Sequence, residues 1–369
     1  MPSLVANPAA SAAPIATGRR LRAAVVGTGK ISEEHLRYLS ADPLVDLVGV
    51  CDLSPSLAKY AAMRFGAAEA YTDAVAMFRQ AKPDVVHVLT PPSTHVMLAT
   101  EALKAGAHVI CEKPIAPQRQ QLLDLWTLAR AKGLKLIEDH NYRFNEPVLA
   151  IEKLHRDGKL GDLREVEVRM VLGGIRKAGR YADTAMPHPS HNLPAGVLHE
   201  FISHLCYLAL RFMPGEPERV AAAWSKHGDE PLFRWDDLDA LVISGNVHAR
   251  IRFSSHTGPD TFSVTVRGEK GWAETDLFQP YLRANIARPG GAQLSPLVNH
   301  VVNGWGMMKS GVRGFRNKVM QHTPYEGLKT FLGQTYAALR ASEEPPVTYN
   351  DMDRASRLID ALLDEKNRL

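Results

Sequence analysis

The sequence predicts an α/β fold, in which a doubly wound parallel sheet is followed by a C-terminal α+β domain with a mainly antiparallel sheet. Between residues 21 and 140, β-rich runs alternate with helical patterns through short connections. This alternation is typical of parallel strands with helices on both faces. After about residue 143, β-rich runs joined by short turns dominate, and such turns connect antiparallel strands.

The elements of the first domain are bounded by glycine, proline and changes of hydrophobic period. Apolar runs predict strands at residues 21–26, 45–51, 85–89, 109–112 and 134–138. Helical periodicity predicts helices from the first turn to about residue 40, and at about 56–65, 94–105 and 118–132. Gly106 closes the third of these helices.

The second domain begins with a helix at residues 148–157 and an alternating strand at 163–171. A loop rich in Gly, Pro and His at 173–194 precedes an apolar helix at 196–213. Further strands are expected at 219–226, 239–245, 247–254, 261–267 and 271–276, and helices at 325–342 and 352–366. We therefore divide the chain into an arm (1–19), a nucleotide-binding domain (20–142) and a substrate and oligomerisation domain (143–369).

Composition places the chain among ordinary globular proteins. Its 369 residues are 45 % hydrophobic and 23 % charged, with a net charge of +4. No nucleic-acid-binding motif accompanies this mildly basic balance, and no apolar run reaches the roughly 18 residues of a transmembrane helix. The Ala/Pro/Ser-rich arm has its arginines after its apolar part, which argues against a secretory signal. Three scattered cysteines fit reduced packing residues in a cytoplasmic protein.

The turn after the first strand reads Gly27-Thr28-Gly29-Lys30-Ile31-Ser32. Here Gly27 permits a tight bend, Gly29 lets the backbone approach a pyrophosphate, and Ser32 is the third small residue. The N-terminus of the following helix offers N–H donors to phosphates. Because this spacing also arises by chance, its place between a strand and a helix carries the prediction of a Rossmann-type dinucleotide site.

Asp52 ends the second predicted strand, twenty residues beyond Ser32. A carboxylate at this place accepts hydrogen bonds from ribose hydroxyls and repels a 2′-phosphate, which favours NAD over NADP. The alternative is a helix cap, because Asp suits that role and Pro55 follows closely.

Two further motifs follow strands that should reach the nicotinamide half of the cofactor. Thr90-Pro91-Pro92 leads to Thr94 and His95, and the alternative there is a rigid turn with a helix cap at Thr94. Glu112-Lys113-Pro114 lies one strand–helix–strand step later. A lysine there can bond a substrate hydroxyl at the carbon that gives up hydride, whereas an ordinary lysine would face solvent.

Glu200 and His204 share one face of the helix predicted at 196–213. A carboxylate beside an imidazole can orient the ring and raise its basicity, as a proton acceptor near neutral pH requires. A local ion pair explains the same spacing. His188, His191 and His199 do not have the spacing of a standard metal motif, so no metal is expected.

Together these residues resemble the glucose–fructose oxidoreductase/inositol dehydrogenase (Gfo/Idh/MocA) family. The resemblance covers roughly residues 21–280 and returns at Glu344–Thr348. Its most specific part runs from Thr94-His95 through Ala105-Gly106-Ala107-His108-Val109 to Cys111-Glu112-Lys113-Pro114. Asn141-Tyr142-Arg143-Phe144, followed by Pro147, resembles the opening of the family's second domain.

The resemblance implies an open antiparallel second sheet, one face of which often forms a dimer or tetramer contact in the family. It also implies that Lys113 bonds the reacting hydroxyl and that His204 takes its proton, with Glu200 where the family usually has Asp and Ile202 where it often has Gly. The expected cofactor-binding residues are Gly27, Thr28, Gly29, Lys30, Ile31, Asp52, Thr90, Pro91, Pro92, His95, Glu112, Lys113 and Arg143.

The segment at about 281–323 is an insertion of unusual charge. From Leu277 to Tyr325 there is no Asp or Glu, and the basic residues are Arg283, Arg288, Lys309, Arg313, Arg316 and Lys318. Part of it has an apolar face made of Leu297, Val301, Val302, Trp305, Met308, Val312, Phe315 and Val319. Three interpretations stay open: a packed helix with a solvated basic face, an arginine cluster for a phosphate-bearing substrate, and a peripheral membrane contact.

The expected function is NAD-dependent hydride transfer at a hydroxyl or keto carbon of a sugar, sugar derivative or cyclitol. One alternative is a redox-neutral sugar enzyme that oxidises its substrate transiently, cleaves, eliminates or epimerises, and returns the hydride. Another is a non-catalytic dinucleotide-binding sensor. The expected partners are a small sugar-like molecule and further copies of the chain, as a homodimer or homotetramer, without nucleic acid and without an expected membrane contact.

Overall fold

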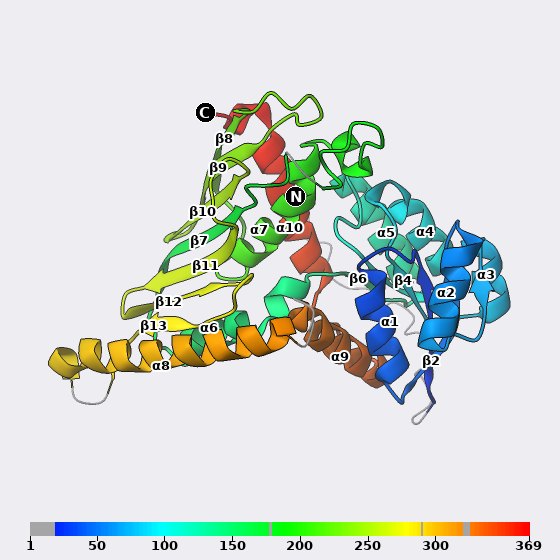
Figure 1. Cartoon of the computed structure of the whole chain (residues 1–369), viewed down its shortest axis with the longest axis horizontal. Helices are drawn as coiled ribbons and strands as arrows, with labels where there is room; N and C mark the ends of the chain where they lie inside the picture. Colours follow the sequence, from blue (N-terminus) through cyan, green and yellow to red (C-terminus); the bar gives the residue numbers. More distant parts are fainter. Residues whose placement is uncertain (1–18, 177–178, 289–290, 320–324) are drawn as a thin grey trace. The chain divides into compact units, whose positions relative to one another are not determined.

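The computed structural model describes residues 19–176, 179–288, 291–319 and 325–369 (Figure 1). Apart from Arg19, the arm expected at residues 1–19 lies outside the described residues, as do residues 289–290 and 320–323 of the insertion. Contacts divide the chain into two compact units. The first joins the described part of Met1–Asp139 to Leu328–Asp353, and the second joins His140–Gly327 to Arg354–Leu369.

The first unit is built on a parallel sheet of strand order β3-β2-β1-β4-β5-β6. Its strands are β1 (Leu21–Val26), β2 (Val45–Cys51), β3 (Ala70–Tyr71), β4 (Val85–Val88), β5 (His108–Cys111) and β6 (Leu136–Glu138). The strands β1, β4 and β5 are buried almost throughout, as expected of central parallel strands with both faces covered. The order reverses between β1 and β4, which in doubly wound sheets opens a ligand crevice at the carboxyl ends of the strands.

Helices connect these strands and complete the predicted alternation (Figure 1). They are α1 (Ser32–Ala41), α2 (Pro55–Phe65), α3 (Ala74–Ala81), α4 (Pro92–Lys104) and α5 (Arg119–Ala131). The two-residue strand β3 and the helix α3 were not predicted, because their short sequences carry too few repeats to show a period.

Part of the C-terminal tail belongs to the first unit, whereas the sequence analysis placed all residues after 142 in the second domain. The helix α9 (Glu326–Ala341) packs most of its length in the first unit, where the Tyr336 hydroxyl lies 2.8 Å from His87 Nε2. Arg119 also forms an ion pair with Asp353, the last residue of this unit, at 2.6 Å. The division of the chain falls within the next helix, α10 (Tyr349–Leu363). Contacts between residues so distant in sequence leave no local signal, so the sequence could not place the tail.

The second unit holds a seven-stranded sheet of order β13-β12-β11-β7-β10-β9-β8. Its strands are β7 (Leu163–Val171), β8 (Arg219–Ser225), β9 (Asp237–Ser244), β10 (Val247–Ser254), β11 (Thr261–Gly268), β12 (Gly271–Asp276) and β13 (Arg283–Asn285). All neighbours pair antiparallel except β7 and β10, which are parallel. The prediction of a mainly antiparallel sheet is confirmed, and β13 is an additional edge strand.

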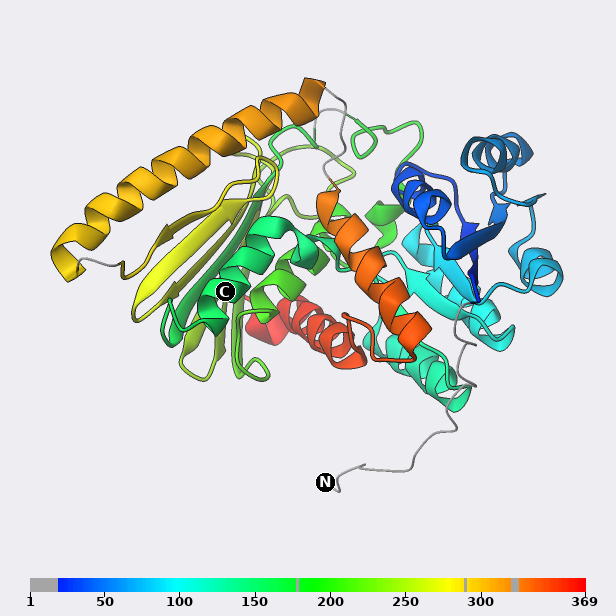
Figure 2. The same cartoon turned by 90° about the horizontal axis from the view of Figure 1, so that it is seen from below.

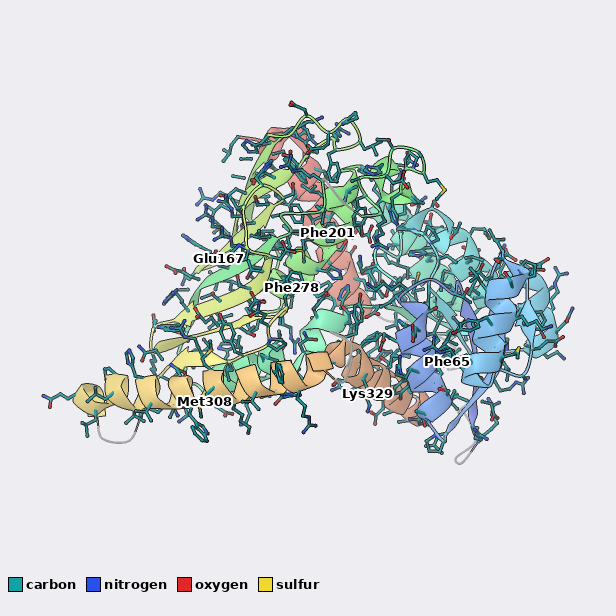
Figure 3. All side chains as sticks on the ribbon, in the orientation of Figure 1. Phe65, Glu167, Phe201, Phe278, Met308 and Lys329 are labelled. Atoms are coloured by element: carbon teal, nitrogen blue, oxygen red, sulfur yellow. The ribbon has the colours of Figure 1, made fainter. Side chains whose placement is uncertain are left out.

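Helices cover one face of this sheet and charged side chains the other. The covering helices α6 (Glu146–Arg156) and α7 (Val197–Leu210) share one core with the strands and with Leu358 and Leu362 of α10. In Figure 3, Phe201 lies on the α7 side of the sheet and Glu167 on the opposite side. On that opposite side Arg250 and Arg252 both pair with Asp239, at 2.5 and 3.0 Å.

A long helix, α8 (Gly291–Val319), runs along the β13 edge of the sheet in both views (Figures 1 and 2). It occupies the predicted insertion. Among the helices formed by the described residues, none is long and apolar enough to cross a membrane.

Candidate active site

The glycine turn of the first unit is shaped by Gly27. Its φ of +94° lies in the left-handed region, and its N–H donates to the Cys51 carbonyl at 2.8 Å. A Cβ at this position would lie 2.8 Å from the backbone carbon and oxygen of Leu89, so no larger residue fits. Gly29, by contrast, has nothing within 4 Å of its Cβ position. The backbone of the turn is therefore fixed behind Gly27 and open to a ligand at Gly29.

Ser32 and Ile31 join this turn to α1. The Ser32 hydroxyl, almost fully buried, donates to the Gly29 carbonyl at 2.6 Å. Ile31 is the N-cap of α1 and contributes no side-chain cap. The Ser32 and Glu34 N–H groups already donate to the Gly29 and Ile31 carbonyls, at 3.0 and 3.1 Å, so the backbone around Gly29 is the part of this turn that can face an anion.

Asp52 is tied to the glycine turn rather than capping α2. Its Oδ2 accepts from the Thr28 N–H at 2.9 Å and the Thr28 hydroxyl at 2.6 Å, while its Oδ1 accepts from the Ser54 N–H at 2.9 Å. Ser54, not Asp52, is the N-cap residue. Partial burial opposes ionisation, but the hydrogen bonds from Thr28 and Ser54 lower the pKa of Asp52 below its usual value. A carboxylate is thus held in place beside the turn, where it could accept hydrogen bonds from the ribose hydroxyls of a dinucleotide.

The two-proline turn after β4 is braced by His95. This ring is fully buried, and its Nε2 and Nδ1 lie 2.6 Å from the Thr90 carbonyl and 2.8 Å from the Pro114 carbonyl. The Thr94 hydroxyl bonds Thr90 and the Pro91 carbonyl, and the helix N-cap is Pro91 rather than Thr94. His95 therefore lies between the turn at Thr90 and the turn that carries Lys113, and its neutral ring can donate to one of the two carbonyls.

Lys113 follows β5 in a turn that is anchored on both sides. Its N–H donates to Glu112 Oε2 at 3.3 Å, and the Lys113–Pro114 peptide bond is cis. Beyond the bond from His95 to Pro114, the Ile115 N–H donates to Glu138 Oε1 at 2.7 Å. The lysine backbone is thus fixed at the carboxyl end of β5, while its side chain is only half-buried.

Glu112 belongs to a buried group of titratable side chains. Its Oε1 lies 3.9 Å from His35 Nε2, and Asp139 Oδ2 lies 3.5 Å from the same nitrogen. His35 Nδ1 in turn lies 2.8 Å from His87 Nδ1. Burial, and then the nearby Asp139 carboxylate, raise the pKa of Glu112 to about 8, whereas burial lowers the pKa of His35 to about 4. At neutral pH this group accordingly favours a protonated Glu112 and a neutral His35.

Replacing Glu112 by Gln is expected to remove a pH dependence of stability. A folded-state pKa of about 8, against 4.5 for the free group, gives stability that is present below pH 4.5 and lost as the pH rises through 8. The free energy of unfolding of the wild type, minus that of Glu112→Gln, should therefore fall by about 1 kcal/mol or more over this range. Denaturant unfolding of both proteins at several pH values measures it, and a pH-independent difference would refute the assignment.

In the second unit, Glu200 lies in the first turn of α7 and accepts several hydrogen bonds. Its Oε1 accepts from Tyr181 at 2.8 Å and from Arg180 at 3.0 Å, and its Oε2 accepts from the Ser190 hydroxyl. Burial, and then the Glu200 carboxylate, raise the pKa of Tyr181 above its usual value. Glu200 thus connects α7 to the loop at 173–194, a role that the sequence did not predict.

His204 lies one turn further along α7 and is nearly buried. Its Nδ1 lies 2.8 Å from the Tyr207 hydroxyl, which accepts from the Tyr142 N–H at 3.3 Å and reaches Asn141 Oδ1 at 3.5 Å. Tyr142 also packs edge-on against the His204 ring, with ring centroids 4.8 Å apart. If Tyr207 donates to Asn141, it accepts from His204 Nδ1–H, and Nε2 is then the unprotonated ring nitrogen.

The residues that sequence reasoning missed are Tyr207, Asn141, Tyr142, Arg180, Tyr181 and Ser190. Tyr207 carried a local signal, since it lies three residues after His204 on the same helix. Asn141 and Tyr142 lay in the segment that resembles the opening of the family's second domain, but no role was assigned to them. The others reach α7 through the chain fold.

Two further residues singled out in the sequence, Arg143 and Ile202, are buried. Arg143 is buried in a short 3₁₀ turn, with its guanidinium carbon 6.0 Å from the Phe144 ring centre. Ile202 is fully buried in the core of the second unit, so it packs against α7's neighbours.

Two of the three histidines considered for a metal, His188 and His191, have other partners. The His191 ring lies 2.8 and 2.9 Å from the carbonyls of Leu232 and Tyr181, and His188 Nδ1 lies 2.9 Å from the Ser190 hydroxyl. Within the described residues, the clusters with metal-ligand spacing are His227-Asp237-His256 and His35-Glu112-Asp139. Neither includes the histidines of the 188–199 region.

Comparison with known families identifies the chain. Residues 21–140 match the model described as "Oxidoreductase family, NAD-binding Rossmann fold", and residues 148–274 match the "GFO/IDH/MocA C-terminal domain". The chain belongs to the Gfo/Idh/MocA oxidoreductase family. The predicted resemblance, fold class and NAD-binding domain are thereby confirmed.

Curated relatives include sugar and cyclitol dehydrogenases. D-glucoside 3-dehydrogenase of Escherichia coli K12 is 34 % identical over 164 residues, which cover 44 % of this chain and 46 % of that protein. Inositol 2-dehydrogenase of Rhizobium meliloti 1021 is 28 % identical over 282 residues, or 75 % of this chain and 82 % of that one. The chain thus spans less than half of the glucoside enzyme's length but most of the inositol enzyme's.

Solved structures agree on the fold. The WlbA dehydrogenase of Bordetella pertussis, solved with NADH and UDP-GlcNAcA, superposes with a TM-score of 0.73 at 20 % identity, covering 95 % of this chain and 96 % of that one. An NAD-binding oxidoreductase from Klebsiella pneumoniae superposes with a TM-score of 0.75 at 17 % identity, covering 94 % and 97 %.

Proposed function

We propose that this protein is an NAD-dependent oxidoreductase that moves hydride between nicotinamide and a hydroxyl or keto carbon of a sugar, sugar derivative or cyclitol. One observation carries the proposal. Gly27, Asp52, Thr90 and Lys113 follow the carboxyl ends of four adjacent parallel strands, β1, β2, β4 and β5. Such an edge is where doubly wound sheets bind dinucleotides. The relatives that are sugar and inositol dehydrogenases support the substrate class.

The residues that would hold NAD fit its parts. The open backbone at Gly29, next to the start of α1, suits the pyrophosphate, and the ionised Asp52 suits the ribose hydroxyls. Bound NAD supplies the hydride acceptor or donor. The chain's own task is then to bind the alcohol, orient it and move its proton.

Lys113 and His204 are proposed to share that task. The anchored Lys113 ammonium donates to the substrate oxygen and favours the charge that develops on it. His204 Nε2 accepts the hydroxyl proton during oxidation and returns it during reduction. The Tyr207 hydroxyl is proposed to set the tautomer by accepting from His204 Nδ1–H while it donates to Asn141 Oδ1. Glu200 is proposed to position α7 against the 173–194 loop.

Asp52 is proposed to make the enzyme prefer NAD. Replacing Asp52 by Ser removes the carboxylate that repels a 2′-phosphate and that Thr28 and Ser54 hold in place. We expect the ratio of affinities for NAD and NADP to fall by about tenfold or more, because one charge contact is typically worth over 1 kcal/mol. Titration of the purified variant with each nucleotide measures the ratio, and an unchanged ratio would remove Asp52 from the ribose site.

The proposed reaction is tested by a substrate screen. The protein, NAD and a panel of sugars, cyclitols and nucleotide sugars are mixed, and the near-ultraviolet absorbance of reduced nicotinamide is followed. Sustained NADH formation with one class supports the proposal and names the substrate. If no compound of the panel yields NADH, although the protein is shown to bind NAD, the proposal of a net dehydrogenase is contradicted.

A second candidate is a redox-neutral enzyme that returns the hydride to its substrate. A specific relative favours it: glycosyl hydrolase family 109 protein 2 of Akkermansia muciniphila is 29 % identical over 179 residues, covering 44 % of this chain and 37 % of that protein. Mass spectrometry of nucleotide released from the denatured protein separates the two. Stoichiometric bound NAD or NADH favours the redox-neutral reaction, and an empty protein that binds NAD reversibly favours the dehydrogenase.

The proposed partners and compartment rest on further features. Arg313 donates to Glu146 at 2.6 Å and to Glu326 at 3.3 Å, so a phosphate-bearing substrate would have to displace two carboxylates. We therefore keep the substrate class at sugar-like molecules in general.

We retain the homodimer or homotetramer as the proposed assembly, which light scattering tests. The three buried free thiols of Cys51, Cys111 and Cys206 support a cytoplasmic location.

A further inference from the structure

The helix α8 lies outside both family-model matches and differs from the other helices of its unit. Its 29 residues give it a length of about 44 Å, and it runs along the edge strand β13 (Figures 1 and 2). An amphipathic helix normally turns its apolar side towards the core. Here the contacts show the reverse.

The polar side of α8 is the side that joins the protein. Asn299, almost fully buried, donates to Asn285 Oδ1 at 2.7 Å and to the Ile286 carbonyl at 2.8 Å. One turn later, Asn303 accepts from the Ala284 N–H at 3.1 Å and donates to the Ala284 carbonyl at 3.0 Å. These amides pair with the unpaired backbone of an edge strand, which protects it. The helix is thus attached through hydrogen bonds on one side.

The apolar side of α8 faces solvent in the single chain. Val301, Trp305 and Phe315 are 72 %, 65 % and 73 % exposed, and Figure 3 shows Met308 on the same helix. Because Val301 and Trp305 come two residues after Asn299 and Asn303, they lie almost opposite the amides on the helix. The exposed apolar residues of α8 are Leu294, Leu297, Val298, Val301, Val302, Trp305, Met307, Met308, Val312 and Phe315. Of the three interpretations left open, a helix packed through its apolar face is therefore not what the described residues show within one chain. An exposed apolar patch of this kind marks an interaction site.

The charged residues that α8 itself carries are all positive. Lys309 lies one turn after Trp305 and Arg316 one turn after Val312, so both share the apolar side, and both are exposed. In the part of the chain that the structure describes, neither takes part in an ion pair. The whole stretch from Leu277 to Tyr325 contains no carboxylate that could neutralise them.

We propose that α8 is a docking helix for a membrane surface that contains anionic lipids. Its apolar side would enter the boundary between headgroups and acyl chains, with Trp305 and Phe315 as anchors. Lys309 and Arg316 extend along the same side, and their long stems let the charges reach lipid phosphates. The helix rests in the membrane plane and does not span it, which leaves both units on one side.

A second copy of the chain is the competing occupant, and charge argues against it. Pairing two α8 helices through their apolar sides brings together the basic residues of both, with no acidic residue on either helix. Like charges in a desolvated contact destabilise it. An anionic lipid surface is complementary to the same residues.

Vesicle flotation of the full-length protein tests the proposal. One set of vesicles contains phosphatidylcholine alone, and the other also contains phosphatidylglycerol. We expect the protein to float with the anionic vesicles about tenfold more than with the neutral ones, and less as salt is added. Trp305→Glu should lower flotation by about tenfold, and the pair Lys309→Gln and Arg316→Gln should do so only with anionic vesicles.

Met63→Glu is the matched control, because Met63 is 77 % exposed on α2 in the other unit. It should float like the wild type, and NAD affinity and thermal unfolding should be unchanged in all variants. Wild-type protein that stays unbound with both kinds of vesicle would overturn the proposal. So would equal flotation of wild type and Trp305→Glu. Failure to float, combined with a lower mass of Trp305→Glu in light scattering, would assign the face to a second copy instead.

Discussion

Lys113→Met and His204→Ala are each expected to lower turnover by about a hundredfold or more, while the protein still folds and binds NAD. The methionine keeps the length of the lysine but removes the ammonium that would hold the substrate oxygen. The alanine removes the only side chain of α7 proposed to exchange the proton. Steady-state turnover on the substrate found by the screen, with NAD affinity and thermal unfolding measured alongside, gives the result.

Lys104→Met is the matched control for the lysine, because Lys104 pairs with Glu101 on the surface of α4, away from the carboxyl ends of the strands. Its turnover should be near that of the wild type. Near-normal turnover in Lys113→Met or His204→Ala would exclude the corresponding residue from the chemistry. Loss of NAD affinity in either variant would instead indicate a binding role.

Gly27→Ala is expected to lose both NAD binding and stability, whereas Gly29→Ala should lose only NAD binding. A Cβ at position 27 would lie 2.8 Å from the Leu89 backbone and would have to tolerate a φ of +94°, so the turn must shift. We expect a stability loss of about 2 kcal/mol or more. A Cβ at position 29 meets no protein atom and extends where the pyrophosphate would lie.

Nucleotide titration and denaturant unfolding of both variants separate the two effects. The comparison is sharp because the two glycines belong to the same turn and change by the same methyl group. Equal stability of Gly27→Ala and the wild type would contradict the packing described for this turn. Wild-type NAD affinity in Gly29→Ala would place the pyrophosphate elsewhere.

The motifs of the first unit were predictable because each lies where a strand ends. A strand followed by glycines, by Asp52 or by Lys113 leaves a local trace in the sequence, and parallel topology then brings these ends to one edge. What each residue contacts was less predictable. The bond between Thr28 and Asp52 spans 24 residues, and the brace from His95 to Pro114 spans 19.

The surroundings of Glu200 and the orientation of α8 could not be predicted for a different reason. Arg180, Tyr181 and Ser190 belong to a loop without periodicity, so nothing in the sequence relates them to α7. The amphipathic period of α8 was visible, but a period shows only that two sides differ. Which side meets the protein depends on the amides of Asn299 and Asn303 and on the edge strand that they cover.

The most direct test of the central claim is a single turnover with protein in excess over substrate. NAD-loaded wild type is mixed rapidly with the active sugar or cyclitol, and the absorbance of reduced nicotinamide is followed. The account predicts that NADH forms, whether it then persists or disappears as hydride returns, and that His204→Ala slows its formation by about a hundredfold. Substrate conversion without any NADH signal, or formation at the wild-type rate in His204→Ala, would contradict it.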